Sequence, residues 1–444
     1  MAKLLRQVRS KFDTLAAHPE EIKEITYQYH ITISNVVSGF DAKSVCILGR
    51  QPSLGMAELE SLYGAKHLRL IDGAAILDIP AEKINFKRLG GTIKVARILG
   101  RVPSTDFRKV VNFLEENVPA HVEGLPDGKF TLGLSVYGIN ASVSDINRAA
   151  LGIKKIVKKT GRSVRVVPNK LPALSSAQVL HNKLTHWGGW ELLAIGSSGK
   201  AIIAQTLFVQ DIEAYAARDQ ARPARDARVG MLPPKLAQII INLAMSAPEF
   251  KDPDTEASQY RIFDPFCGTG VILQEALLMG YGVYGSDIDQ RMVDYSIKNV
   301  QWLIAHHPQI ETHVVIEQAD ATKDRLPRFS AVASEVYLGK PLKSLPPFGK
   351  LNPIIDEANG IVVSFLQNLL TVIPSDKFKK RRRIVLAVPA WRRPSGELIH
   401  LPVIAKLTDM GYNRVAFKHV RNDELIYFRE NQVVARQLLV LERS

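Results

Sequence analysis

The sequence has few of the features that mark secreted, membrane or metal-binding proteins. Of its 444 residues only two are cysteines, Cys46 and Cys267, and they lie too far apart in sequence to make a metal-binding pattern. No apolar run reaches the length of a membrane span, and the N-terminal stretch has no apolar signal core. These absences exclude a disulfide scaffold, a zinc module and a membrane helix, and we expect a cytoplasmic protein.

The charge balance indicates a polyanionic partner. The chain carries 58 Lys and Arg against 44 Asp and Glu, which gives a net charge of +14. Neutralisation of phosphates gives such a protein affinity for nucleic acid of any sequence. A membrane surface is the alternative partner, but no strongly amphipathic basic membrane anchor is evident apart from the N-terminal stretch, where we expect a plain helix.

A chain of this length exceeds one hydrophobic core, and its patterns divide it into several parts. We expect an extension at 1–43, a small α+β domain at 44–105 and a second α+β domain at 106–212. A charged linker at 213–232 leads to residues 233–444, where strands and helices alternate. This alternation predicts a mostly parallel sheet, and the last two strands predict an antiparallel hairpin at its edge.

The most informative stretch is Asp264-Pro-Phe-Cys-Gly-Thr-Gly270, which joins a buried strand to a helix. Its glycines, Gly268 and Gly270, allow a ligand to approach bare backbone at a helix N-terminus. A dinucleotide fingerprint needs a third glycine, and Leu273 stands in that place. The carboxylate of Asp264 favours a cationic ligand without phosphate, such as S-adenosylmethionine (SAM), and we expect Phe266 to contact it as well.

Two further acids follow at strand ends. Asp287 ends the next strand, where a carboxylate can accept both ribose hydroxyls of a nucleoside, and Ile288 gives the adenine an apolar wall. Asp320, with Ala321 after it, ends the third strand and can bind the adenine amino group. The alternative is that these acids only cap helices and turns. Their combination with Asp264 and the two glycines favours a SAM site.

Four stretches give the chain a family resemblance. They begin at Ile47, Ser175, Gly230 and Asp264, and they read I-L-G-R-Q-P-S-L-G-M-A-E-L-E, S-S-A-Q-V-L-H-N-K, G-M-L-P-P-K-L-A and D-P-F-C-G-T-G. In this order they resemble the THUMP-domain RNA methyltransferases, most closely the archaeal-type tRNA guanine-N2-methyltransferases. The resemblance implies a ferredoxin-like domain at 44–105, an RNA-binding THUMP domain at 106–212 and a Rossmann-like methyltransferase domain at 233–444 with SAM as cofactor.

The loop after the fourth strand departs from the family pattern. Amino methyltransferases carry Asp/Asn-Pro-Pro-Tyr/Phe there, which supplies acceptors for an exocyclic amine and an aromatic ring that stacks on the base. This chain has Ser334-Glu335-Val336-Tyr337 instead. We assign Ser334, Glu335 and Tyr337 as catalytic residues, with Glu335 as the acceptor if the loop shifts by one residue. The alternative is an ordinary strand-end turn with little or no methyl transfer.

Basic side chains concentrate in the part that resembles a THUMP domain. A helix is expected over Asp145–Lys159 with Ser144 as its N-cap, and its apolar positions place the lysines on one outer face. The candidate RNA-binding residues are Lys154, Lys155, Lys158, Lys159, Arg162 and Arg165. The alternative is a solvated helix face, but the net charge and the resemblance favour RNA.

The sequence therefore predicts an α/β enzyme that transfers a methyl group from SAM to an exocyclic amine of RNA, in the first place guanine N2 of tRNA. We expect direct transfer without a metal ion. One alternative is an RNA-binding protein that keeps a SAM pocket but has lost transfer. Another is an N-methyltransferase that acts on rRNA or DNA.

Overall fold

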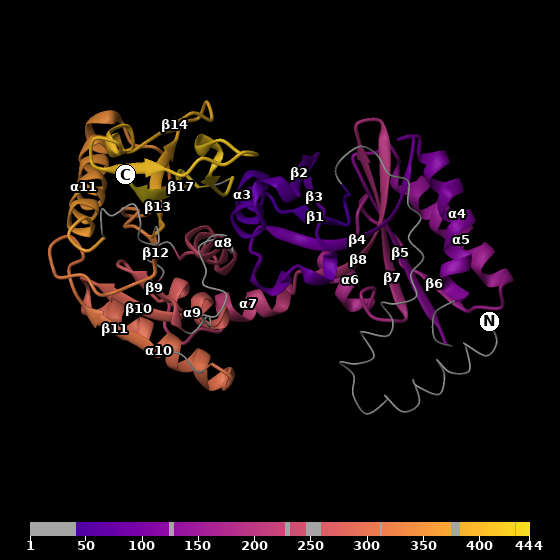
Figure 1. The fold of residues 1–444 in the computed structure, drawn as a ribbon, viewed down its shortest axis with the longest axis horizontal. Coiled ribbons are helices and arrows are strands. Elements are labelled where there is room, and N and C mark those ends of the chain that lie inside the picture. The colour runs from indigo at the N-terminus through magenta and orange to yellow at the C-terminus, as the bar shows by residue number, and fades with distance from the viewer. Residues whose placement is uncertain are drawn as a thin grey trace. The chain divides into compact units, whose positions relative to one another are not determined.

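The computed structural model describes residues 41–123, 128–226, 231–245, 259–310, 313–373, 382–430 and 432–444. Residues 1–40 of the expected extension and 227–230 of the expected linker lie outside this set. The described chain forms two compact units: unit 1 is residues 97–206 with Asp41, and unit 2 is residues 42–96 with 207–444. Two strands, β4 (Thr92–Val102) and β8 (Lys200–Val209), carry the chain from one unit into the other (Figure 1).

Unit 1 is a sheet with two long helices packed against it. Its strands follow the order β8-β7-β5-β6, in which β7 is antiparallel to β8 and parallel to β5. Its remaining elements are α4 (Phe107–Glu123), β5 (Phe130–Tyr137), α5 (Val143–Lys159), β6 (Val164–Val166), α6 (Ser176–His181) and β7 (Gly189–Ser197). Helices α4 and α5 lie side by side, and α5 buries Ile146, Ile153 and Val157 completely.

The N-cap of α5 is Ser142, so the prediction of Ser144 was wrong. Ser142 has the extended backbone of an N-cap, and its Oγ accepts a hydrogen bond from Asp145 N at 3.1 Å. Both serines precede the same apolar pattern, and the pattern alone does not fix which of them leaves the helix first.

Unit 2 contains a sheet in the strand order β11-β10-β9-β12-β13-β17-β15. The strands β9 to β13 are parallel, and β17 runs antiparallel between β13 and β15. The strands are β9 (Arg261–Asp264), β10 (Gly282–Asp287), β11 (Val314–Gln318), β12 (Ala331–Glu335), β13 (Ile384–Arg392), β14 (Leu398–Ile399), β15 (Tyr412–Arg414), β16 (Ile426–Tyr427) and β17 (Val434–Arg443). The expected hairpin is present as β16 and β17, but β17 lies inside the sheet because β15 pairs with its outer side.

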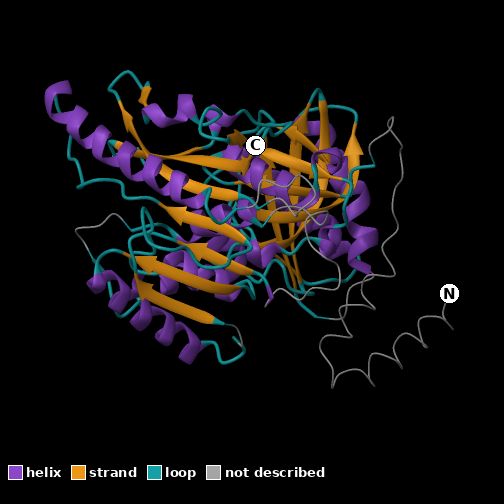
Figure 2. Ribbon diagram, turned by 60° about the vertical axis from the view of Figure 1, so that its left-hand side comes forward, coloured by secondary structure: helices purple, strands orange, loops and turns teal. Residues whose placement is uncertain are grey.

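Helices cover both faces of this sheet. They are α8 (Pro234–Ala244), α9 (Val271–Leu278) and α10 (Gln290–His306) on one face and α11 (Phe348–Leu369) on the other, while α7 (Ile212–Gln220) precedes α8 (Figure 2). Neighbouring side chains of β13 belong to different cores, since Val385 and Ala387 pack in one and Leu386 in the other. This alternation is typical of a doubly wound α/β domain. None of the helices in the described ranges is long and apolar enough to cross a membrane.

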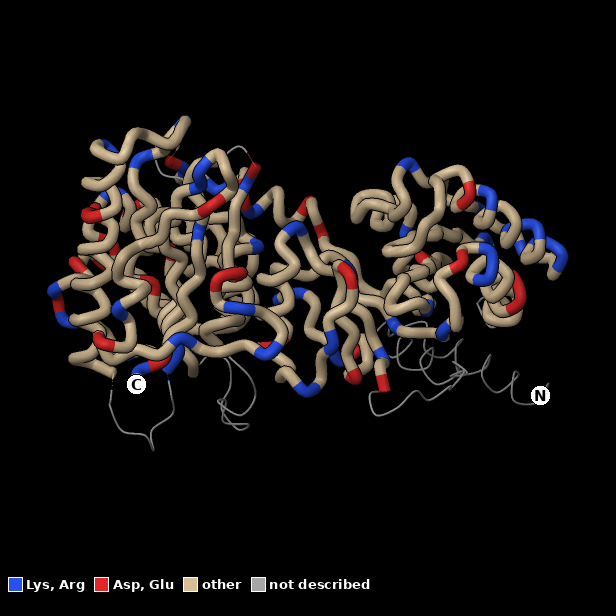
Figure 3. Tube along the Cα trace, turned by 90° about the horizontal axis from the view of Figure 1, so that it is seen from above, with Lys and Arg blue, Asp and Glu red and all other residues tan. Residues whose placement is uncertain are grey.

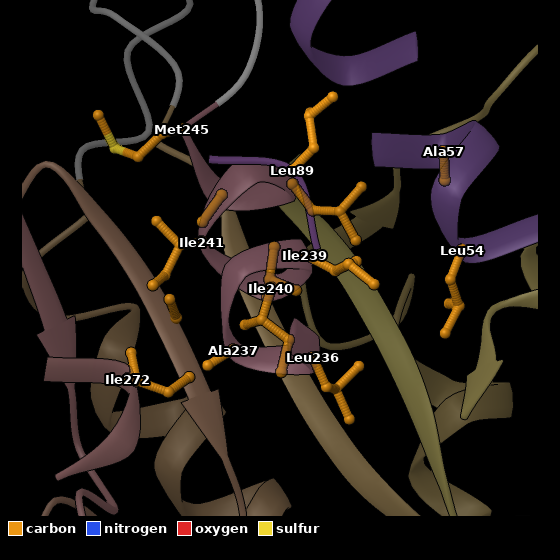
Figure 4. Packing of buried hydrophobic residues seen from close by; sticks show 14 of the residues in the cluster. Leu54, Ala57, Leu89, Leu236, Ala237, Ile239, Ile240, Ile241, Met245 and Ile272 are labelled. Atoms are coloured by element: carbon orange, nitrogen blue, oxygen red, sulfur yellow. The ribbon is translucent and has the colours of Figure 1, made fainter. Parts of the chain in front are cut away.

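Residues 42–96 share a hydrophobic core with this sheet. Their elements are β1 (Ser44–Leu48), α3 (Pro52–Tyr63), β2 (Leu68–Ile71) and β3 (Ala74–Leu77), and their strands follow the order β2-β3-β1-β4. Leu54 and Ala57 of α3 lie in one cluster with Leu236 and Ile240 of α8 (Figure 4). Unit 2 is therefore held together by apolar burial between parts of the chain that are distant in sequence.

A buried carboxylate reinforces the packing of α3 on α8. Glu58 is fully buried and accepts hydrogen bonds from Gly90 N and Gly91 N, each at 2.9 Å, and from Asn242 Nδ2 at 2.7 Å. The glycines are needed because a Cβ on Gly90 would lie 2.0 Å from the carbonyl oxygen of Lys235. Burial raises the pKa of Glu58 to about 7, although its hydrogen bonds act in the opposite direction.

We predict that this carboxyl group makes the protein less stable as pH rises from about 4.5 to about 7. A carboxyl group with a pKa of 4.5 when unfolded and about 7 when folded favours folding at low pH, and this contribution is lost as pH rises through the folded pKa. Urea unfolding across this range should show a loss of at most about 3 kcal/mol in the free energy of unfolding.

The variant Glu58→Gln separates this effect from other titrations. It should be less stable throughout, because its amide cannot accept hydrogen bonds from both glycines, and its stability should decline less with pH. The exposed Glu213→Gln is the matched control and should behave as the wild type. An unchanged pH dependence in Glu58→Gln contradicts the prediction.

Candidate functional site

The candidate site lies at the carboxyl ends of β9, β10, β11 and β12. Strand β9 has β10 on one side and β12 on the other, so the chain order of the sheet reverses there. Loops that leave neighbouring strands toward opposite faces open a crevice at such a point. A pocket of about 510 Å³ lies at these strand ends, and this volume is typical of small-molecule sites.

The turn after β9 is shaped by its glycines. Gly268 and Gly270 have φ values of +51° and +78°, in the left-handed region that favours glycine. A Cβ on Gly270 would lie 2.8 Å from Ser296 Oγ, and that hydroxyl donates a hydrogen bond to Gly268 O at 2.9 Å. Helix α9 begins directly after Gly270, so Gly268, on the pocket wall, comes just before the N-terminus of a helix.

Asp264 is the last residue of β9 and lies on the pocket wall. It is 2% exposed, and its Oδ1 accepts a hydrogen bond from Ser334 Oγ at 2.5 Å. Burial raises the pKa of Asp264 to about 8, against the effect of the Ser334 bond. Ser334 does not line the pocket, because its side chain is fully buried and its hydroxyl is bound to Asp264. The structure therefore makes Ser334 a residue that positions Asp264, and not the catalytic residue that the sequence led us to expect.

Asp287 ends β10 with both carboxylate oxygens directed by the backbone. Its Oδ2 accepts a hydrogen bond from Gly268 N at 2.9 Å, and its Oδ1 accepts one from Asp289 N at 3.0 Å. Each oxygen keeps a lone pair for a ligand hydroxyl. Burial raises the pKa of Asp287. The next residue, Ile288, lines the pocket and is 66% exposed, as expected for an apolar group that contacts a ligand.

Asp320 follows β11 and completes the predicted set of acids. Its Oδ1 accepts hydrogen bonds from Thr322 N at 3.0 Å and from Thr322 Oγ1 at 2.5 Å, and its Oδ2 pairs with Lys323 at 3.1 Å. These contacts, the Thr322 hydroxyl first, lower the pKa of Asp320. Phe266 and Ala321 also line the pocket. The structure thus brings the three carboxylates to one cavity.

Glu335 is the last residue of β12, and Tyr337 follows in the loop; both line the pocket. Glu335 Oε1 is paired with Arg436 Nε of β17, a residue 101 positions later that the sequence gave no reason to single out. Burial raises the pKa of Glu335, and Arg436 opposes this shift. Val336 N donates to Ala387 O at 3.0 Å, which fixes the start of the loop, and Tyr337 is 40% exposed.

The six candidate RNA-binding residues belong to unit 1 and not to the pocket. They lie on α5 and on the stretch that leads through β6. Lys155, Lys158, Lys159 and Arg165 are exposed, and Lys154 and Arg162 are partly exposed. Arg165 Nη2 donates a hydrogen bond to Asn182 Oδ1 at 2.9 Å.

The segment before α8 contributes to the pocket through Met231 and Leu232. Asn299 of α10 ties this segment to the glycine turn, because its side chain bonds the backbone N and O of Ala224, each at 2.9 Å, and Thr269 O at 2.8 Å. Met231 stands in a motif that the sequence had singled out. No pattern in the neighbouring sequence marks Asn299 as part of the site, since it acts only through these contacts with distant residues.

The pocket fits SAM better than a dinucleotide. SAM needs acceptors for its ammonium and ribose hydroxyls, and three carboxylates provide them. Two cations lie on the pocket wall: Arg291 is paired with Asp226 at 3.1 Å and with Asp289 at 3.5 Å, and Lys340 is exposed. Five acids line the same wall, so negative side chains outnumber the cations that a pyrophosphate would favour. The wall is therefore suited to a ligand of positive charge.

The fold and the pocket together define a Rossmann-like, SAM-dependent methyltransferase domain. Sequence comparison assigns the same part of the chain: residues 225–353 match the UPF0020 family, described as "RMKL-like, methyltransferase domain". This stretch contains all four strand ends that form the pocket. The cofactor of the domain is S-adenosylmethionine.

The similar curated proteins are archaeal enzymes named tRNA (guanine(10)-N2)-dimethyltransferase. The chain is 45% identical over 85 residues to the one from Methanothermobacter thermautotrophicus, covering 19% of this chain and 22% of that protein. It is 28% identical over 162 residues to the one from Pyrococcus abyssi, covering 36% and 39%. Among solved structures, TrmN from Thermus thermophilus aligns with 90% of this chain and 99% of its own, at 17% identity and a TM-score of 0.47. The matches thus span less than half the length of these two curated relatives.

We predict that SAM affinity rises with pH because of Asp264. The cofactor ammonium favours the ionised carboxylate, whose pKa is about 8 in the protein alone, so binding releases a proton. As pH rises toward 8, the dissociation constant for SAM should fall by up to roughly tenfold per pH unit. The trend should end near pH 8, where the cofactor's own amino group loses its proton.

Calorimetry of the variant Asp264→Asn tests this assignment. The variant should bind SAM roughly 10- to 100-fold more weakly, as expected for the loss of a charge-assisted hydrogen bond, and its affinity should be nearly independent of pH. The exposed Asp409→Asn is the matched control. Wild-type affinity and pH dependence in Asp264→Asn would show that this carboxylate does not hold the ammonium.

Proposed function

We propose that the protein is a SAM-dependent RNA methyltransferase that modifies an exocyclic amine, namely N2 of guanine in tRNA, in the cytoplasm. The observation that carries the proposal is the convergence of the three carboxylates with Glu335 and Tyr337 on one pocket. The named activity of the curated relatives supports the choice of substrate. In this proposal residues 44–105 serve as a ferredoxin-like domain and residues 106–212 as a THUMP domain.

In this proposal, acids at three strand ends each bind a different part of the cofactor. Asp264 holds the ammonium group, Asp287 accepts the ribose hydroxyls, and Asp320 accepts the adenine amino group. The bound cofactor supplies an electrophilic methyl group. Because Asp264 and Asp287 are held by hydrogen bonds to Ser334 and Gly268, their oxygens need little reorganisation when the ligand binds.

Glu335 is the acceptor for the target amine in this proposal. Its Oε1 is held by Arg436, while its Oε2 has no hydrogen-bond partner within the described residues. An acceptor at that position draws an amine N–H toward itself, directs the nitrogen lone pair toward the cofactor and receives the proton after transfer. Tyr337, partly exposed on the same wall, offers a ring on which the guanine stacks.

The absence of both prolines from the loop is compatible with this role. Prolines restrict the backbone and so keep the acceptors in place. Here the bond from Val336 N to Ala387 O extends the pairing of β12 with β13 by one residue, and Val336 is fully buried. Strand pairing and an ion pair therefore replace the restriction that prolines give the family motif.

The proposal is tested by nucleoside mass spectrometry of total tRNA and rRNA from cells with and without the protein. We expect N2-methylguanosine in tRNA to disappear when the protein is absent. The purified protein should restore it in the same tRNA when SAM is added. If the protein binds SAM and RNA but methylates neither tRNA nor rRNA, the result would instead support the alternative of an RNA-binding protein that keeps a SAM pocket but has lost methyl transfer.

We predict that Glu335→Gln lowers kcat roughly 100- to 10 000-fold, because a neutral amide cannot take up the proton. The affinity for SAM, measured by calorimetry, should stay within about twofold, since none of the three cofactor carboxylates changes. The surface variant Glu397→Gln, 65% exposed, is the control. Full activity in Glu335→Gln would remove Glu335 from the mechanism.

We also predict that Arg436→Gln shifts the acidic limb of the pH–rate profile to higher pH. Arg436 lowers the pKa of Glu335 against the effect of burial, so its loss raises that pKa further and delays ionisation. The rate should fall most at low pH and recover as pH rises, with Arg436→Lys intermediate. A loss of rate that is uniform across pH would indicate a structural role only.

A further inference from the structure

The feature that carries a further inference is Trp187, on the turn between α6 and β7 of unit 1. It is 64% exposed, although tryptophan is among the side chains with most to gain from burial. Trp190, three residues later, is 4% exposed and packs edge-to-face on Phe130 with ring centroids 5.0 Å apart. The core of unit 1 therefore uses one tryptophan of this pair and leaves the other available to a ligand.

The turn holds Trp187 in an ordered backbone. His186 N donates to Lys183 O at 3.2 Å, Gly189 N donates to His186 O at 2.9 Å, and Thr131 N of β5 donates to Gly188 O at 2.9 Å. Gly189 has no room for a side chain, since a Cβ would lie 2.3 Å from Lys183 O. A ring displayed by such a turn loses little conformational entropy when it binds.

Cations lie at the same end of the sheet of unit 1 as this turn. Arg165 pairs in the sheet register with Thr131 of β5, which pairs in turn with Gly189 of β7, so Arg165 lies about 10 Å across the sheet from the base of the turn. Arg165 also donates to Asn182 Oδ1 at 2.9 Å, at the beginning of the turn. Lys129 and Lys183 are exposed beside it. The aromatic ring and the cations thus lie at one end of the sheet of unit 1.

The charge along this stretch is of one sign. From Ile146 to Trp190 the chain has no Asp or Glu, and its Lys and Arg residues are Arg148, Lys154, Lys155, Lys158, Lys159, Arg162, Arg165, Lys170 and Lys183. Blue Lys and Arg positions accordingly recur along unit 1 in Figure 3. A surface that served only solubility would mix both signs, whereas a polyanion selects one.

We propose that Trp187 stacks on an unpaired base of the RNA substrate, while Arg165 and Lys183 bind the phosphates on either side of that base. An aromatic ring flanked by cations is how proteins bind single-stranded nucleic acid, because every base has a face that can stack. This inference rests on the proposed function for its RNA and assigns to unit 1 a preference for a single-stranded segment.

The experiment uses the full-length protein and two labelled probes: a hairpin RNA with a single-stranded tail and the same hairpin with a blunt end. Fluorescence anisotropy should show that the tail increases the affinity of the wild type. Trp187→Ala should lose roughly 5- to 150-fold in affinity for the tailed hairpin and little for the blunt one. Trp187→Phe, which keeps an aromatic ring, should retain most of the tail-dependent affinity.

Leu171→Ala is the matched control, because Leu171 is 69% exposed in the same unit and should not matter. The inference is overturned if Trp187→Ala binds the tailed hairpin as the wild type does, or if it loses both probes equally. The inference is also overturned if two results occur together: polyglutamate binds the wild type more tightly than the tailed hairpin does, and polyglutamate displaces neither probe from the Trp187→Ala variant. Arg165→Gln should lower the slope of log affinity against log salt by about one.

The outcome is separable from that of the proposed function, because the assay measures binding without methyl transfer. Tail-dependent binding through Trp187 in a protein that modifies no RNA would sustain this inference and refute the enzyme. If Trp187→Ala changes neither the methylation of tRNA nor the binding of the probes, the proposed function would stand and this inference would be refuted.

Discussion

The methyltransferase site depends on the side-by-side pairing of β9 and β12, from which the chain continues to opposite faces of the sheet. This pairing opens the crevice, and the hydrogen bond from Ser334 to Asp264 joins the two strands at its floor. Asp264 is buried and has no ion-pair partner within the described part of the chain, and burial raises its pKa. A carboxylate held in this way gains most of its stabilisation when a cation arrives, so the strand order itself provides selectivity for a positively charged ligand.

Local patterns in the sequence were enough to place the glycine turn and the three acids at one pocket. A strand followed by a glycine turn and a helix is visible within about ten residues, and Asp287 and Asp320 could be placed because parallel strands end at the same edge of a sheet. The pairing of β17 with β13, by contrast, joins segments with no common local signal. Arg436, its ion pair with Glu335 and the inner position of β17 followed from that pairing and could not be read from either segment alone.

The same limit applies to the organisation of the chain. Segments in sequence order suggest that residues 44–105 form a domain separate from the methyltransferase part. In the structure residues 42–96 share a core with α8, and Glu58 bonds Asn242 across that contact. Gly90 is needed because α8 approaches it, and Gly91 is needed because Gly55 of α3 does. A glycine in the sequence can indicate that another segment packs closely there, but it does not identify that segment.

In the proposed function, the distribution of charge reconciles two ligands of opposite sign in one basic protein. A cofactor that carries positive charge requires the acids at the strand ends, and those acids would repel a nucleic acid backbone. The chain separates the two demands: the carboxylates lie within the pocket wall, partly neutralised by burial or by Lys323 and Arg436, while Ile146–Trp190 carries cations without a single acid. In the proposed function, a polyanion that binds Ile146–Trp190 therefore meets no Asp or Glu of that stretch, and only its target base has to enter the pocket.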